Sequence, residues 1–355
     1  MSPRRPAVAV GLDISIGSIK VAELQIARGE PVLASLGIVN LPEGVIKDGE
    51  IEDPVTLSNL LKELWGRTGL KHRRVILGVA NQKVIVRPIE IPYMEAEELE
   101  SALRFQVQEF IPIPVEDAIL DFDIIEEFMT SDDQRMLSVL LVAAYRDMVQ
   151  SFVDTVRSAG LTAIAIDLKA FALPRALLPR TYPGMVETGE EAEAICIINV
   201  GAGITNMVIV KEGVPRFART LLRGGDDFTR TLMDRLDLDA GEAEQIKLGL
   251  AVNEDAAALM RQDMYRFVGE IRRSLDYFVT QTGERNLRKI VLAGIGSRII
   301  NLPQEMNQGL HLPVEIGRSF QNVQLGKLPF TPEELAEIEP SVAVSVGLAL
   351  REVME

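Results

Sequence analysis

VGLDISIGSIKVAEL at residues 10–24 and IINVGAGITNMVIV at residues 197–210 are built in the same way, and this duplication sets the expected architecture. In each copy an apolar run leads into a polar turn rich in small residues and then into a second apolar run, which is typical of a strand hairpin. Glycines in such a turn let backbone N–H groups approach an anion closely, as in loops that bind phosphate. Asp13 and Asn199 stand at equivalent places. Two such loops, about half a chain apart, predict two similar lobes that close on one nucleotide.

Composition and charge narrow the class of protein. The chain has 355 residues, of which 47% are hydrophobic and 25% charged, as expected for a globular protein of more than one domain. The net charge of −15 argues against nucleic acid as a partner, because proteins that bind the phosphate backbone present a basic face. The single cysteine, Cys196, lies in an apolar run and predicts a buried residue in a reducing compartment. No stretch approaches the roughly 20 apolar residues that span a bilayer, so we expect a cytoplasmic protein without direct membrane insertion.

The segments around the two hairpins predict the rest of each lobe. From about residue 82 a proline-limited edge strand, an amphipathic helix, two strands and a second helix indicate a small inserted α+β block. The second half of the chain predicts a group of three helices and ends in a helix of small residues suited to close packing. Beyond the hairpins, the expected elements are strands at 32–41, 75–79, 84–92, 120–128, 136–145, 163–167, 216–222, 289–292 and 313–316, and helices at about 57–65, 95–110, 149–159, 171–178, 228–236, 240–248, 255–279, 302–310 and 341–355.

Three loops together resemble the phosphate 1, phosphate 2 and adenosine motifs of the actin/Hsp70/hexokinase superfamily. They are Asp13–Lys20, Asn199–Asn206 and Gly294–Arg298, the last of which follows a buried strand. The inserted block is similar in place and content to the extra subdomain of the division protein FtsA, and the ordered set of landmarks resembles most the PilM family of type IV pilus assembly proteins. The predicted fold is therefore α/β, an actin/Hsp70-like duplicated ribonuclease H-like fold with an inserted FtsA-type α+β subdomain.

The resemblance implies four subdomains. Subdomain 1A, in lobe one, is expected to comprise residues 1–82 and 159–192 with the C-terminal helix 341–355. The inserted subdomain 1C is expected at 83–158. Subdomain 2A, in lobe two, is expected to comprise 193–227 and 287–340, and the helical cap 2B residues 228–286.

The resemblance also implies an ATP site between the lobes, with Mg²⁺ held by Asp13 through water. The first loop would meet the β- and γ-phosphates and the second loop their other side, while Glu244 and Lys247 would contact the ribose and Arg298 the adenine. Other interpretations stay open: either loop is also typical of an ordinary tight turn, Glu244 and Lys247 of a surface salt bridge, and Arg298 of a solvated loop cation. The expected nucleotide-binding residues are Asp13, Gly17, Ser18, Lys20, Asn199, Gly201, Ala202, Gly203, Thr205, Asn206, Gly225, Glu244, Lys247, Gly294, Gly296, Ser297 and Arg298.

Departures from the superfamily pattern bear on catalysis. Asn199 stands where the second phosphate loop usually opens with Asp, and a neutral amide cannot act as a general base. Lys169-Ala170 replaces an expected Glu-Pro pair, which removes a carboxylate that would orient water. Ser15 stands where the family tends to have Gly. No catalytic residue is therefore assigned, Asp13 and Asn199 being nearest the phosphates, and we expect at most a slow ATPase.

The partner implied by the resemblance is the short cytoplasmic N-terminal peptide of the membrane protein PilN, bound in a groove between subdomains 1A and 1C. This places the protein at the periphery of the inner membrane through its partner, with self-association as a further possibility. Two alternatives remain: a filament-forming division protein like FtsA and a small-molecule kinase of the same superfold. The FtsA family ends in a basic amphipathic tail, whereas this sequence stops after its packing helix, which we take to count against the first alternative. A small-molecule kinase needs an Asp base, and no evident candidate is found for the second.

Overall fold

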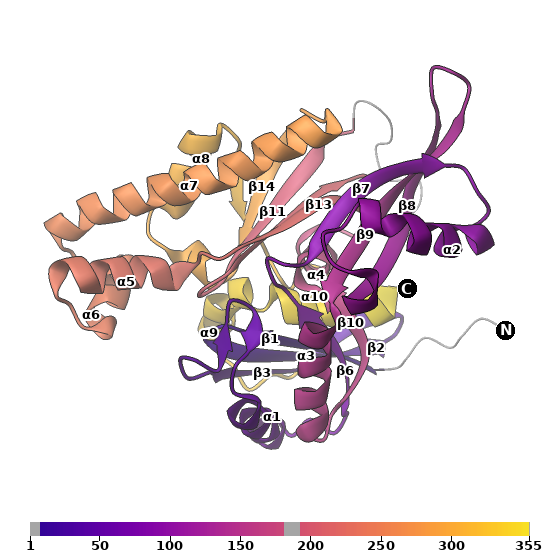
Figure 1. The fold of residues 1–355 in the computed structure, drawn as a ribbon. Coiled ribbons are helices and arrows are strands. Elements are labelled where there is room, and N and C mark those ends of the chain that lie inside the picture. Colours follow the sequence, from indigo (N-terminus) through magenta and orange to yellow (C-terminus); the bar gives the residue numbers. More distant parts are fainter. Residues whose placement is uncertain (1–7, 181–191, 355) are drawn as a thin grey trace.

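The fold contains two sheets of the same construction, one in each lobe (Figure 1). The computed structural model describes residues 8–180 and 192–354. In each sheet an antiparallel hairpin continues into a third strand on one side, while parallel strands extend it on the other. The first sheet contains, in order, β10 (Thr162–Leu168), β6 (Arg74–Val79), β1 (Val8–Ser15), β2 (Ser18–Ala27), β3 (Glu30–Asn40) and β16 (Gln324–Leu325). The second contains β13 (Val214–Leu221), β12 (Thr205–Lys211), β11 (Ala194–Val200), β14 (Leu287–Ala293) and β15 (Val314–Ile316). This duplication confirms the predicted fold class.

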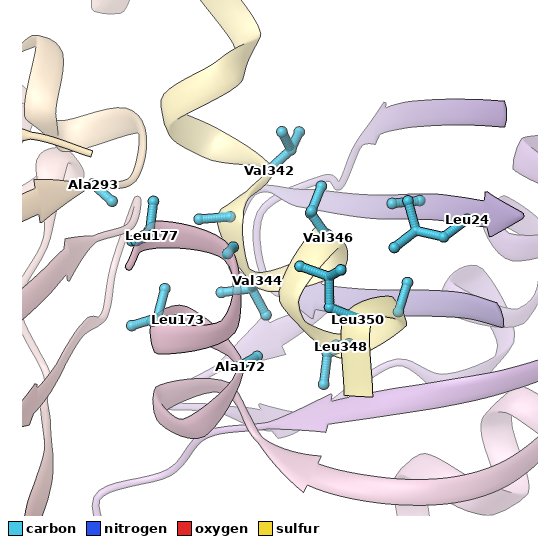
Figure 2. Packing of buried hydrophobic residues seen from close by; sticks show 14 of the residues in the cluster. Leu24, Ala172, Leu173, Leu177, Ala293, Val342, Val344, Val346, Leu348 and Leu350 are labelled. Atoms are coloured by element: carbon cyan, nitrogen blue, oxygen red, sulfur yellow. The ribbon is translucent and has the colours of Figure 1, made fainter. Parts of the chain in front are cut away.

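Helices α4 (Lys169–Leu177) and α10 (Ala343–Met354) lie between the two sheets (Figure 1). Their apolar side chains share one core with residues of both sheets, including Leu24 from β2 and Ala293 from β14 (Figure 2). The small residues expected in the last helix permit this packing. A Cβ on Gly347 would lie 1.9 Å from the carbonyl oxygen of Ala172 in α4, so the two backbones touch. This core joins the lobes on the side of each sheet opposite its outer helices.

The inserted block has a core of its own. Its sheet has the order β7 (Ile85–Pro92), β9 (Arg135–Tyr145), β8 (Ala118–Met129), and it packs against α2 (Ala96–Gln106). Helix α3 (Arg146–Ser158) lies elsewhere, because its buried Phe152 and Val156 pack in the lobe-one core with α1 (Pro54–Thr68). We therefore propose that the inserted unit ends at about residue 145, with β9, and that α3 belongs to lobe one.

The helical group of lobe two covers the outer face of the second sheet (Figure 1). It consists of α5 (Gly225–Leu236), α6 (Ala240–Lys247), α7 (Glu254–Thr282) and α8 (Leu302–Leu310). Several short elements were not predicted, because two-residue strands and single helical turns carry no sequence period. They are β4 (Ile46–Lys47), β5 (Glu50–Ile51), β16, α9 (Pro332–Ile338) and the 3₁₀ helices Val115–Asp117, Ile295–Arg298 and Glu339–Ser341. The helix expected at 95–110 is observed as α2 followed by the 3₁₀ turn Val107–Glu109.

Some expectations reach beyond the described residues. The lobe-one ranges 1–82, 159–192 and 341–355 include residues 1–7, 181–191 and 355, which lie outside them. Within the described ranges, no helix is both long enough and apolar enough to cross a bilayer.

Candidate functional site

The two predicted phosphate loops face each other where β1 and β11 end. Each of these strands runs parallel to a neighbour, so the loops occupy the carboxyl ends of parallel strands, where α/β sheets bind ligands. Their backbones approach closely. A Cβ on Gly17, which has φ +81°, would lie 3.4 Å from the Cβ of Ala202, and a Cβ on Gly203 would lie 2.9 Å from Cδ1 of Ile16. The structure therefore brings together the two halves of the predicted site, and the side chain of Ile16 lies between them.

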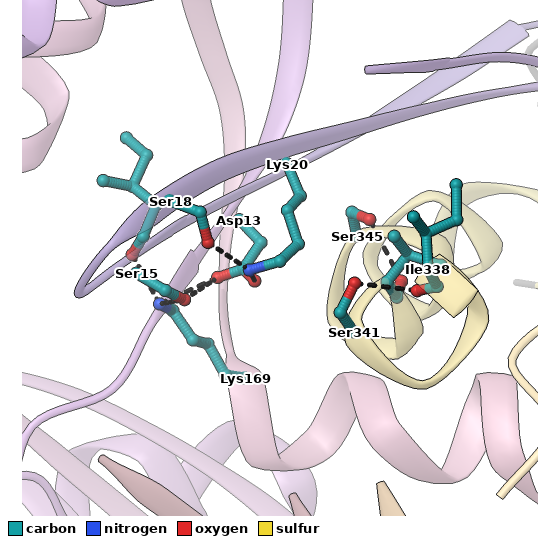
Figure 3. A network of polar contacts seen from close by, with 10 residues as sticks. Asp13, Ser15, Ser18, Lys20, Lys169, Ile338, Ser341 and Ser345 are labelled. Carbon is teal, nitrogen blue, oxygen red and sulfur yellow. Dashed lines mark hydrogen bonds and ion pairs between the residues drawn. The ribbon is translucent and has the colours of Figure 1, made fainter. Parts of the chain in front are cut away.

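Asp13 is the centre of a buried polar network in the first loop (Figure 3). Its Oδ1 accepts a hydrogen bond of 2.7 Å from Oγ of Ser15 and lies 2.8 Å from Nζ of Lys169. Its Oδ2 lies 3.7 Å from Nζ of Lys20, which in turn donates to Oγ of Ser18 at 2.7 Å. One carboxylate is thus held by two ammonium groups, of which Lys169 is the nearer.

Burial and charge act on this network in opposite directions. Burial by itself would raise the pKa of Asp13, but the charges of Lys169 and Lys20, with hydrogen bonds from Lys169 and Ser15, outweigh it and hold that pKa below its usual value. The pKa of Lys20 is also lowered, chiefly by burial; Asp13 opposes this shift and the charge of Lys169 adds to it. The Asp13 carboxylate is therefore ionised at neutral pH.

The residues around Asp13 do not fit the predicted magnesium site. A hydrated Mg²⁺ needs free carboxylate oxygen on one side, and an ammonium group that already binds that oxygen competes with the metal ion and repels it. Here both carboxylate oxygens of Asp13 face lysine ammonium groups, and the equivalent residue of the second loop, Asn199, is neutral. The expectation that Asp13 holds the metal overlooked Lys169, which follows β10 and lies 155 positions away from Ile14 along the chain.

A cavity of about 30 Å³ lies between the two loops. Because one water needs roughly 10–15 Å³ measured in this way, the cavity holds about two waters, far less than a triphosphate. The described residues that line it carry no carboxylate; they are Ile14, Ser15, Ile16, Ile46, Gly49, Ala80, Phe152, Lys169, Asn199, Gly201, Ala202, Gly203, Ile204 and Asn206. In this arrangement the space between the loops is therefore too small for a nucleotide.

The second loop is tied to the start of α5. The backbone N–H of Gly225 donates to Gly201 O at 2.9 Å, and that of Asp226 donates to Ala202 O at 2.8 Å. A Cβ on Gly224 would lie 2.2 Å from Ala202 O, so only glycine permits this contact. The N–H groups of Gly225 and Asp226 are thus used within the protein in this closed arrangement.

Two further side chains of the second loop are turned to internal partners. The hydroxyl of Thr205, which is fully buried, donates to the carbonyl oxygen of Arg223 at 2.7 Å. Oδ1 of Asn206 accepts a hydrogen bond of 3.2 Å from Thr220. Of these two predicted ligands, only Asn206 lines the cavity.

In the Glu244–Lys247 pair the lysine is buried, whereas the side chain of Glu244 is 40% exposed. Nζ of Lys247 is buried and donates to Oγ1 of Thr229 at 2.8 Å and to the carbonyl oxygen of Gly225 at 3.3 Å, in addition to its ion pair with Glu244. The hydroxyl of Thr229 donates to the same Glu244 oxygen at 2.5 Å. The pair therefore joins α6 to the start of α5 directly behind the second loop, so that Gly225, Glu244 and Lys247 lie together.

The predicted adenosine loop packs against the end of β11. Gly294 has φ +85°, and a Cβ on it would lie 2.2 Å from Val200 O, while a Cβ on Gly296 would lie 2.3 Å from Cγ1 of Val200. Oγ of Ser297 donates to Gly294 O at 2.7 Å. Arg298 is partly exposed and lies 3.7 Å from a carboxylate oxygen of Glu337 in α9, which agrees better with the alternative of a surface cation.

A separate groove of about 410 Å³ lies where lobe one meets the inserted block. One wall comes from β5 and the segment after β6, and the other from the end of β9 and the start of α3. It offers an aromatic ring and a thioether between charged groups, and Glu50 and Lys83 form an ion pair of 2.7 Å at its edge. The lining residues are Glu50, Ile51, Asn81, Lys83, Tyr145, Asp147, Met148 and Ser151.

Comparison with known proteins identifies the family. The family model described as type IV pilus assembly protein PilM matches residues 11–353. The chain belongs to the PilM family. A solved structure of a PilM–PilN type IV pilus biogenesis complex is 28% identical in sequence to this PilM family member, with a TM-score of 0.81, and the match covers 98% of this chain and 99% of that one.

More distant relatives of this PilM family member share its actin-like fold. FtsA of Streptococcus pneumoniae is 21% identical over 86% of this chain, and FtsA of Bacillus subtilis is 22% identical over 70%. The matches span 68% and 59% of those two proteins. MreB5 of Spiroplasma citri bound to AMPPNP is 12% identical, with a TM-score of 0.51, and its match covers 98% of this chain and 97% of that chain. The FtsA alternative is thus only a distant relationship.

Proposed function

We propose that this protein is an actin-like scaffold of the type IV pilus assembly platform that holds the cytoplasmic N-terminal peptide of a PilN-like membrane protein. The observation that carries the proposal is the match of nearly the whole chain to a PilM–PilN complex. The protein would act at the cytoplasmic side of the inner membrane through this partner.

The groove between lobe one and the inserted block is the proposed peptide site. It is a depression with an aromatic side chain, Tyr145, and a flexible apolar one, Met148, between polar groups, as is typical of sites for short peptides. Ile51 and Met148, on opposite walls, both pack against the lobe-one core, and Tyr145 ends strand β9 of the inserted block, so the groove lies on the lobe-one side of the junction.

Binding of the peptide can be tested by isothermal titration with the N-terminal cytoplasmic segment of the PilN-like protein from the same organism. Tyr145→Ala removes the aromatic ring that the empty groove exposes. We expect at least a tenfold weaker Kd for the peptide, since an aromatic side chain that a bound peptide covers contributes over 1 kcal/mol. Tyr265→Ala removes a more exposed ring from α7 in the other lobe and is expected to leave the Kd unchanged. Equal affinities of the two variants would contradict this placement.

We further propose that ATP binds between the two loops after the lobes separate. Support comes from the paired glycine loops, from the positive charges of Lys20 and Lys169, and from the bound nucleotide analogue in MreB5, a protein of similar fold. Hydrolysis would be slow or absent, because no described residue lining the cavity carries a carboxylate that could act as a base. Titration with ATP, with phosphate release followed on the same sample, tests both statements: rapid release would contradict the second.

A further inference from the structure

Lys169 is the first residue of α4, yet its side chain reaches the first loop. Its ammonium group contacts three oxygen atoms, namely Oδ1 of Asp13 at 2.8 Å, Oγ of Ser15 at 2.9 Å and the carbonyl oxygen of Ile14. A lysine ammonium has three N–H donors, so this oxygen cage satisfies all of them. The residue is only 6% exposed and lies at the start of α4, between the lobes, so its ammonium group is shielded from solvent in this arrangement.

The cage resembles a small cation site filled by a side chain. Carboxylate, hydroxyl and carbonyl oxygens are the atoms that a hard divalent cation takes as ligands. A cation at this place would lie within a few ångströms of the Lys169 ammonium, and two like charges at that distance in a buried site repel strongly. The ammonium and a metal ion therefore exclude each other at Asp13.

The charge of Lys169 also faces the place proposed for the phosphates. Lys169 lines the cavity between the loops together with Asn199 and Gly203, which come from the opposite side. Together with Lys20 of the first loop, Lys169 sets two cations against the single carboxylate of Asp13, a balance of about +1. A fixed positive charge that neutralises an entering polyphosphate is what a divalent cation otherwise supplies.

We propose that Lys169 takes the place of a divalent cation beside Asp13, so that this protein binds a nucleoside triphosphate without Mg²⁺. The inference rests on the proposed nucleotide binding and adds how the phosphate charge is neutralised. It also gives Asp13 a different role: the carboxylate positions the lysine and does not ligate a metal ion.

The test is isothermal titration of the full chain with ATP in EDTA and with ATP in excess Mg²⁺. We expect the Kd in EDTA to be no more than threefold weaker than the Kd with Mg²⁺. A Kd at least tenfold weaker in EDTA would overturn the role of Lys169 while leaving nucleotide binding in place. Absence of binding in both buffers would overturn the proposed nucleotide binding itself and this inference with it.

Two variants separate the lysine from a metal. Asp13→Asn removes one negative charge from the first loop but keeps an oxygen that can accept a hydrogen bond from Lys169, so ATP affinity in EDTA is expected to rise at least threefold; a metal-dependent site would lose binding. Lys169→Glu places a carboxylate where the ammonium lies, and binding is then expected to require Mg²⁺, with at least a tenfold weaker Kd in EDTA. Lys327→Glu makes the same charge change on the exposed surface of lobe one and is expected to keep the wild-type ratio of the two Kd values.

Far-UV circular dichroism and the melting temperature show whether each variant folds. Should Lys169→Glu fail to fold, Lys169→Met provides the same contrast, since it removes the charge and keeps the length. We expect its Kd in EDTA to be at least tenfold weaker than that of wild type. Unchanged binding in EDTA would show that the ammonium does not neutralise the phosphates and would overturn the inference.

Discussion

A double-mutant cycle on Asp13 and Lys169 measures how strongly the buried pair stabilises lobe one. At 2.8 Å and an effective dielectric constant of 20, two unit charges attract by about 6 kcal/mol before desolvation is subtracted. Removing one partner of a buried pair costs about 3–5 kcal/mol. For Lys169→Met we expect about 3 kcal/mol, the low end, because Lys20 remains 3.7 Å from Oδ2 of Asp13.

The cycle predicts strong coupling between the two residues. Asp13→Asn alone is expected to cost about 3 kcal/mol, since two buried ammonium groups lose their counter-charge, and the double variant clearly less than the sum of the two single ones. The coupling energy is therefore expected to be about 2–3 kcal/mol.

Urea unfolding followed by the fluorescence of Trp65 provides the assay. Trp65 is the single tryptophan of the sequence and lies buried in the lobe-one core that β1 also enters, so its signal reports the lobe that holds the pair. If both single variants cost less than about 1 kcal/mol and their effects add, the reasoning from burial and charge is refuted.

Three further predictions follow from packing and charge. Gly347→Ala places a methyl group against the Ala172 carbonyl and is expected to lower the free energy of unfolding by about 1–3 kcal/mol. Gly66→Ala, which has open space around it in α1, is expected to raise the free energy of unfolding by up to about 1 kcal/mol. Thermal unfolding of the two variants tests this difference. The lowered pKa of Asp13 means that its stabilising effect is fully present above its unfolded pKa, about 3.9, and is lost as pH falls toward its lower folded pKa. Asp13→Asn is therefore expected to flatten the loss of stability below about pH 4 in urea titrations. Lys247→Met leaves Glu244 and the Gly225 carbonyl without their shared cation. Because Glu244 is 40% exposed and can be hydrated, we expect a loss of about 1–2 kcal/mol in urea unfolding, and a loss below about 0.5 kcal/mol would contradict the buried role of Lys247.

The duplicated fold was predictable because its signal is local. Alternating apolar runs around a glycine turn specify a hairpin within about 15 residues, and the second copy at residues 197–210 specifies the repeat. The small residues of the last helix likewise predicted its close packing, which Gly347 shows.

The chemistry at Asp13 was not predictable in the same way. The pair with Lys169 joins two segments that are far apart in sequence, and no spacing rule connects them. In the sequence, Lys169 was noted only because it replaces an expected glutamate. Its contact with Asp13 depends on the position of α4 between the lobes. The burial of Lys247 was missed for a similar reason: spacing placed it beside Glu244, but its burial depends on Thr229 in another helix.

The position of α10 has a consequence for synthesis on the ribosome. This helix covers the inner face of the first sheet and completes the core that β1 and β2 begin, although the whole of lobe two separates them along the chain (Figure 2). A growing chain folds in the order in which its segments emerge. The first lobe, with its phosphate loop already translated, therefore keeps an open apolar face until residues 343–354 have left the exit tunnel, and only then can its core close.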